Sequence, residues 1–173
     1  MTAHYATAGT FSGVGYILAQ VGPPLATRQG GGLKLRRPNG VISLAPGVPV
    51  AVSNVSVAGS TYPLDWVPLC GWGSNGPVEV RLTVGQTQQV SAVYEPLPAR
   101  LEGNGRAAGF RLGLSGAVGM SYRIEWTTNL GLPNSWTTNQ PAYPISNCLP
   151  VVLPGLEPAA GASRFFRAVP ARN

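Results

Sequence analysis

The chain has 173 residues, enough for one large or two small domains, and a net charge of +6 from 12 basic and 6 acidic side chains. Apolar residues make up 44% of it and charged residues only 10%. The apolar content excludes a disordered chain, and 23 glycines and 17 prolines leave no uninterrupted window for an amphipathic helix. The composition therefore predicts many short strands joined by Gly/Pro turns.

The first strand patterns lie in the N-terminal half. The apolar run "GYILAQV" (15–21) comes first, and "GLKLRR" (32–37) and "VISLA" (41–45) form a predicted hairpin around the turn "PNG". The next strand, 49–59, changes the phase of its alternation at Ser53-Asn54, which predicts a β-bulge there.

Two further strands precede a predicted domain boundary. Residues 77–84 and 89–95 each place alternate apolar side chains on one face, and the turn "GQTQ" between them predicts that the second strand returns along the first. The stretch "EPLPAR" (95–100) has two prolines and opposite charges, as a short stiff linker does. We therefore predict an N-terminal β domain over 1–97, with a flexible tail at 1–10, and a C-terminal module over 98–173.

Strands continue beyond the linker. Alternation is clear in "GFRLGLSG" (109–116) and "GMSYRIEWTT" (119–128), and shorter patterns follow at 150–153 and 164–169. The predicted fold is all-β, with two small antiparallel β-sandwiches of the immunoglobulin or fibronectin type in tandem.

The stretch "SYRIEWTTNLGLPNSW" (121–136) is the most patterned part of the chain. Tyr122, Ile124 and Trp126 share one strand face, which predicts that all three lie in the core. Arg123 and Glu125 would then be outward neighbours. Trp136 follows a Leu-Pro-Asn turn, and we expect it to fold back as a lid on the same core.

The C-terminal part resembles a small β module that ends many large secreted or surface proteins of Verrucomicrobia and Planctomycetes. The similarity covers about residues 100–171, in "GFRLGLSGAVGMSYRIEWTTNLGLPNSWTT" and the closing "SRFFRAV". The matching residues are Phe110, Tyr122, Ile124, Glu125, Asn129, Leu130, Trp136, Arg164, Phe165, Phe166, Arg167 and Ala168.

Residues 48–95 are similar to bacterial surface repeats that end in "GW…V.V..G.T..V.A.Y". The matching residues are Gly71, Trp72, Val78, Val80, Val84, Gly85, Val90, Ala92 and Tyr94. Both resemblances imply extracellular β modules of adhesins, fibre or surface-layer proteins, or accessories of secreted enzymes. Neither implies a catalytic residue or a cofactor, and both place the protein outside the cell or on its surface.

The cysteines Cys70 and Cys148 lie far apart in the sequence. In an oxidising compartment they would form one disulfide, whereas the expectation that we favour is two separate buried thiols. The N-terminal residues lack the basic and apolar regions of a signal peptide, so either the protein is cytoplasmic or the sequence is a mature segment, which is the expectation that we favour. No stretch approaches the ~20 apolar residues of a membrane span.

Residue types that support catalysis or metal binding are scarce. The one histidine, His4, lies among small polar residues near the N-terminus, where an exposed side chain is expected. The six carboxylates are dispersed and show no metal-ligand spacing. We therefore predict a protein that is not an enzyme and uses no cofactor or metal.

Carbohydrate binding is one predicted function. The Pro/Gly-rich stretch 60–76 contains three aromatic rings, which would stack on sugars if exposed and would close the end of the core if buried. The candidate ligand-binding residues are Tyr62, Asp65, Trp66, Trp72 and Asn75.

A basic cluster, Lys34, Arg36 and Arg37, is a candidate contact for polyanions. Since basic residues alternate with leucines there, a solvated strand face is the simpler interpretation. Aromatic residues are not interleaved with the cluster, so we expect no nucleic-acid partner.

Self-assembly is a third predicted function, beside carbohydrate binding and contact with polyanions. The apolar segment 11–21 would suit a subunit that exchanges a strand at a sheet edge, although it would equally form the first strand of its own domain. The function that we predict is a non-catalytic extracellular or cell-surface structural and interaction protein, which self-assembles or binds another surface protein. The alternative is a carbohydrate-binding accessory module with a polysaccharide partner.

Overall fold

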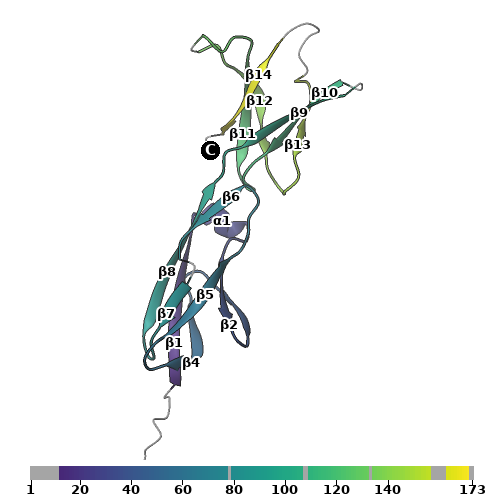
Figure 1. Cartoon of the computed structure of the whole chain (residues 1–173). Helices are drawn as coiled ribbons and strands as arrows, with labels where there is room; N and C mark the ends of the chain where they lie inside the picture. Colours follow the sequence, from purple (N-terminus) through teal and green to yellow (C-terminus); the bar gives the residue numbers. More distant parts are fainter. Residues whose placement is uncertain (1–11, 78, 107–108, 133, 157–162, 172–173) are drawn as a thin grey trace, which may run out of the picture. The chain divides into compact units, whose positions relative to one another are not determined.

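The computed structural model of the chain describes residues 12–77, 79–106, 109–132, 134–156 and 163–171. These residues form several antiparallel sheets and one five-residue helix, which confirms the prediction of an all-β protein (Figure 1). The chain divides into two compact units. Unit 1 comprises residues 1–67 and 74–94, and unit 2 comprises residues 68–73 and 95–173. Segment 68–73 thus groups with the C-terminal residues, while our assignment of domains to 1–97 and 98–173 stays a prediction.

Two four-stranded sheets build unit 1 (Figure 1). The first contains, in spatial order, β4 (Pro49–Ser56), β1 (Ser12–Gly22), β8 (Thr87–Pro96) and β6 (Trp72–Asn75). The second contains β3 (Gly40–Leu44), β2 (Leu33–Arg37), β5 (Ser60–Trp66) and β7 (Glu79–Leu82). The short helix α1 (Pro24–Arg28) follows β1.

The core of unit 1 is formed by side chains that the alternation of apolar residues predicts to point inward. Both sheets contribute to one apolar cluster, for example Ile17 and Val90 from the first sheet and Leu35 and Val80 from the second. The predicted hairpin of β2 and β3 is confirmed, with Leu33 opposite Leu44 and Arg37 opposite Gly40.

The predicted β-bulge at Ser53-Asn54 is confirmed. On β1, Gly13 lies opposite Val55 and Gly15 lies opposite Val52, so two residues of β4 face the single residue between these glycines. Asn54 has φ of 62°, a left-handed conformation that asparagine tolerates better than most residues.

Two predictions about pairing in unit 1 are wrong. β8 does not return along β7, because β7 pairs with β5 and β8 pairs with β1 in the other sheet. The β1–β8 pair is also parallel, so the sheets are not entirely antiparallel. Both strands still contribute apolar side chains to the same core. The apolar alternation requires only that one face of each strand is buried, and it does not specify the neighbouring strand.

The segment that we considered for strand exchange is a central strand of its own sheet. β1 pairs with β4 over residues 12–18 and with β8 over residues 16–22, so it has a neighbouring strand on each side. Only residue 11 of the segment 11–21 lies outside the described residues.

Two three-stranded sheets build unit 2 (Figure 1). One contains β13 (Val151–Leu153), β10 (Gly109–Ser115) and β9 (Arg100–Arg106), and the other contains β12 (Thr137–Pro144), β11 (Ser121–Thr127) and β14 (Phe165–Pro170). Their shared core includes the predicted inward residues Leu112, Leu114, Tyr122 and Ile124. Phe110 packs against this core and stacks on Phe166, with ring centroids 6.2 Å apart.

The predicted positions of two tryptophans are wrong. Trp126 is half-buried and lies outside the core cluster, with the guanidinium of Arg164 4.3 Å from its ring centroid. Thr127 is buried in its place, because its hydroxyl accepts a hydrogen bond from the Asn129 N–H and bonds to Ser135 in the following loop. Trp136 does not cover the core either, since its ring stacks on Arg167.

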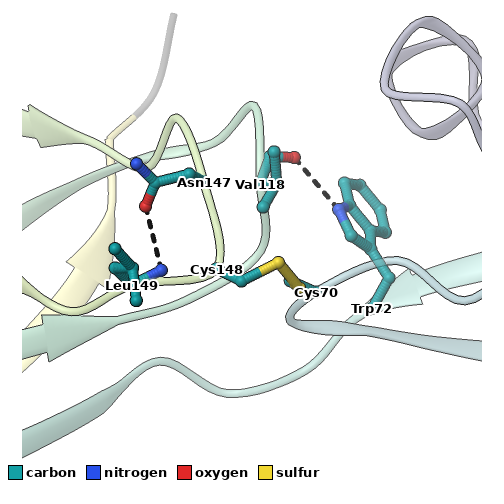
Figure 2. Close-up of a disulfide and its surroundings, with 6 residues drawn as sticks. All are labelled: Cys70, Trp72, Val118, Asn147, Cys148 and Leu149. Atoms are coloured by element: carbon teal, nitrogen blue, oxygen red, sulfur yellow. Dashed lines mark hydrogen bonds between the residues drawn. A yellow bond between two sulfur atoms is a disulfide. The ribbon is translucent and has the colours of Figure 1, made fainter.

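Cys70 and Cys148 form a disulfide within unit 2, with Cα atoms 5.4 Å apart (Figure 2). Our favoured expectation of two separate thiols is therefore wrong. Segment 68–73 is also held by backbone hydrogen bonds, in which Val118 N–H donates to Cys70 and Leu97 N–H donates to Gly71. Gly71 has φ of 72°, and a Cβ there would overlap the Gly116 backbone, so glycine is required at this close approach.

Candidate functional site

Unit 1 has a groove of about 590 Å³. It is built from three chain segments, namely the turn of the β2–β3 hairpin, the bulge in β4 and the beginning of β5. The lining residues are Arg36, Arg37, Pro38, Asn39, Ser53, Asn54, Ser60, Thr61, Tyr62 and Pro63. The groove therefore brings together residues from two of our predicted sites, the basic cluster and the stretch 60–76.

Arg37 and Tyr62 are the groove residues on inward strand faces. Leu33 and Leu35 are buried on β2, and Arg37 continues this alternation at the end of the strand. Leu35 lies opposite Leu64 of β5, and Arg37 and Tyr62, each two residues further along its strand, both line the groove. Tyr62 is 9% exposed, so most of its ring packs in the core.

Arg37 forms no ion pair with another described residue. Its Nε–H is shielded from solvent and has no acceptor among the described residues, a state that the Nε–H of Arg123 in unit 2 shares. By contrast, Arg36 points outward and forms a two-pronged ion pair with Asp65 at 2.9–3.1 Å. Since both partners are substantially exposed, this pair contributes little to stability.

The two tryptophans of the stretch 60–76 are packed rather than presented to solvent. Trp66 is half-buried and packs edge-on against Tyr94, with ring centroids 5.3 Å apart. Trp72 is 7% exposed, and its indole Nε1–H donates to the Val118 carbonyl at 3.0 Å (Figure 2). Trp66 packs against the core of unit 1, as the buried alternative expects, whereas Trp72 is buried outside that core and is hydrogen-bonded within unit 2.

The remaining predicted site residues lie on the surface. Lys34 is exposed on β2 and does not line the groove. Asn75 is exposed at the end of β6. Asn75 does not line the groove either.

Unit 2 has a second polar hollow of about 480 Å³, lined by Glu125, Asn134, Trp136 and Arg167. Arg167 donates from Nε to Glu125 at 2.7 Å and lies 4.1 Å from the ring centroid of Trp136. The outward position predicted for Glu125 is consistent with this pair, in which Glu125 on β11 lies opposite Arg167 on β14. The sequence contains one signal for three of these four residues, since Glu125, Trp136 and Arg167 belong to the motif that carries the resemblance.

The two sheets of unit 1 differ in the charge of their outer faces. Alternate outward residues of β4, β1 and β8 are uncharged as far as Val93, and they are Val14, Tyr16, Leu18, Gln20, Pro49, Ala51, Thr87, Gln89, Ser91 and Val93. The next outward residue of β8, Glu95, is charged and belongs to unit 2. The outer face of the other sheet carries five charges, on Lys34, Arg36, Asp65, Glu79 and Arg81. Sequence reasoning missed this contrast because it depends on which strands share a sheet.

Within the described residues, no group of three or more His, Cys, Asp or Glu side chains is arranged to hold a metal ion. His4 lies outside these residues. The described helix is too short to cross a membrane.

Comparison with protein families, with curated proteins and with solved structures found no match to this chain. The two resemblances described above therefore stay predictions.

Proposed function

We propose that this chain is a non-catalytic structural and interaction module of an extracellular or cell-surface protein, and that copies of it associate through the uncharged outer face of β4, β1 and β8. The disulfide between Cys70 and Cys148 supports the location, because such bonds persist in oxidising compartments. The shared core of two sheets in each unit supports sandwiches of the immunoglobulin or fibronectin type.

The uncharged sheet face is the observation that carries this proposal. Charged residues are depleted from the centres of protein interfaces, where their desolvation costs free energy. This face also exposes apolar side chains, with Val14 39%, Tyr16 38% and Val93 47% exposed. Isolated apolar residues are normal on surfaces, but here they accompany a run of uncharged outward residues on three adjacent strands, which ends at Glu95 of β8.

The net charge of the chain determines on which face a second copy meets the least repulsion. Two copies with a charge of +6 repel one another over most of their surfaces. The repulsion is smallest where the facing surfaces are uncharged, so association of like copies is directed to this sheet. A strongly acidic partner would instead favour the basic residues of the other sheet.

Light scattering over a range of concentrations tests the proposal, with Tyr16→Lys as the variant. A lysine there places one charge at the centre of the face, between Ala51 and Thr87 of the neighbouring strands. Wild-type protein should increase in mass with concentration, and the variant should remain a monomer.

Thr61→Lys is the matched control, because it adds the same charge to an exposed position on the outer face of β5. It should associate as the wild type does. A wild-type chain that stays monomeric up to about 1 mM, or equal loss of association in both variants, would rule out assembly through this face.

The alternative function, carbohydrate binding by exposed aromatic rings at 60–76, has less support. Stacking on a sugar requires an accessible ring face, and Tyr62 and Trp72 are at least nine-tenths covered.

A further inference from the structure

The groove of unit 1 contains an incompletely paired cation. Arg37 lines the groove, and its buried Nε–H lacks an acceptor among the described residues. The ion pairs of the described chain join Arg36 to Asp65, Arg100 to Glu102, and Arg167 to Glu125. None of them neutralises Arg37. A guanidinium in this state gains more from an arriving anion than one that is fully solvated, because less hydration is lost.

The rest of the groove suits hydroxyl groups. Five lining side chains are neutral amides or alcohols, which both donate and accept hydrogen bonds, and they are Asn39, Ser53, Asn54, Ser60 and Thr61. The Tyr62 hydroxyl makes no hydrogen bond to another described residue, so it is also available. Pro38, Pro63 and the edge of the Tyr62 ring supply apolar contacts.

We propose that this groove binds a carboxylated saccharide, a uronic acid unit of an acidic polysaccharide. The carboxylate would accept hydrogen bonds from Arg37, and the ring hydroxyls would bond to the amide and alcohol side chains. A volume of about 590 Å³ lies within the range of small-ligand sites. The proposal rests on the groove alone and is independent of association through the uncharged sheet face.

Other anions fit the groove less well. A nucleic acid brings closely spaced phosphates and bases that stack on open rings, whereas the groove has one unpaired cation and a Tyr62 ring that is 9% exposed. An acidic peptide offers the charge but few hydroxyls for the neutral polar side chains. A uronate combines one carboxylate with several hydroxyls.

Isothermal titration of the full disulfide-bonded chain tests this inference, with a short oligogalacturonate as the ligand. Its methyl ester is the matched ligand control, since it keeps the sugar rings and removes the charge. The acid should bind saturably, and the ester should bind about tenfold more weakly or not at all.

Arg37→Met and Lys34→Met form the matched pair of variants. Both remove one positive charge from β2, but Lys34 is exposed and lies outside the groove lining. Methionine retains much of the aliphatic stem of arginine, so packing is largely preserved. Arg37→Met should weaken oligogalacturonate binding about tenfold or more, while Lys34→Met should stay within roughly twofold of the wild type.

Tyr62→Phe provides a second variant if Arg37→Met fails to fold. It keeps the core ring and removes only the hydroxyl, and it should weaken binding roughly threefold. Equal binding of acid and ester, equal losses in the Arg37 and Lys34 variants, or unchanged binding by Tyr62→Phe overturns the inference. So does tighter binding of an aspartate-rich peptide, or no saturable uronate binding up to about 10 mM.

Discussion

The guanidinium of Arg167 lies over the ring of Trp136, 4.1 Å from the ring centroid, while its Nε–H donates to Glu125 at 2.7 Å. The Glu125 side chain is only 14% exposed, whereas Arg167 is 50% exposed. Trp136 is thus held on the outer surface of β11 and β14 by a cation and a largely covered carboxylate. Trp136 therefore attaches the end of the preceding loop to the outer surface of the sheet, and it does not cover the core.

Arg167→Met should destabilise unit 2 by about 1–2 kcal/mol, because it leaves the covered carboxylate of Glu125 without its cation and removes the contact with Trp136. Urea unfolding followed by tryptophan fluorescence measures the change. Arg100→Met is the control, since the Arg100–Glu102 pair is exposed on both sides and should contribute less than about 0.5 kcal/mol. Equal effects of the two substitutions would contradict this account of the cluster.

Tyr94 ties two loops of unit 1 together through its hydroxyl. The oxygen accepts a hydrogen bond from the Gly32 N–H at 3.0 Å and lies 2.7 Å from the Val67 carbonyl, to which it can donate. Tyr94→Phe leaves these largely covered backbone groups unpaired and should cost about 1–2 kcal/mol of stability, measured by urea unfolding. Tyr62→Phe is the control, because the Tyr62 hydroxyl has no described partner, and it should change stability by less than about 0.5 kcal/mol. A loss as large for Tyr62 as for Tyr94 would show that the hydrogen bonds of Tyr94 are not the cause.

Alternation along single strands was sufficient to predict most inward residues of both cores. Val90, Ala92 and Tyr94 are buried on β8 as expected, because side chains two apart must face the same side of a strand. The sheet partner of β8 was not predictable in the same way. The apolar face of β8 would be buried whether β8 paired with β1 or with β7. Which strand it pairs with depends on contacts between residues distant in sequence.

The candidate site was predictable only in pieces. The sequence predicts Arg37 as part of a basic cluster that contacts polyanions, and it predicts Tyr62 as part of a separate carbohydrate site in the stretch 60–76. Their meeting depends on the register of β2 with β5, and the groove also needs the bulge at Asn54 on β4. The prediction for Trp126 is wrong because period 2 treats a large apolar ring as inward, whereas Arg164 covers this ring at the surface. The prediction for Trp136 is wrong because the turn before it leads the ring to Arg167 and not to the core.

Reduction of the disulfide should destabilise unit 2 and leave the strands of unit 1 protected. Cys70 and Cys148 are 78 residues apart, so the bond restricts a long loop of the unfolded chain and should contribute about 2–4 kcal/mol. Hydrogen exchange with and without a reducing agent measures both units in one experiment. The control is Cys70→Ser/Cys148→Ser, whose exchange should not respond to the reducing agent. Equal protection of β10 and β11 in the oxidised and reduced wild type would contradict a stabilising role.

The backbone conformation of Asn54 should determine how well the bulge, and with it one wall of the groove, is formed. At φ of 62° a β-branched side chain is strained, whereas glycine is not. Asn54→Val should therefore cost about 1–2 kcal/mol of stability, and Asn54→Gly should remain within about 0.5 kcal/mol of the wild type in thermal or urea unfolding.

Ser53→Val is the matched control, because Ser53 is an exposed neighbour of Asn54 in the bulge and has no positive φ. If Ser53→Val destabilises the protein as much as Asn54→Val, the cost arises from the apolar side chain and not from the left-handed backbone. If the backbone is the cause, Asn54→Val should also weaken ligand binding in the groove, since the wall formed by Ser53 and Asn54 shifts with the bulge.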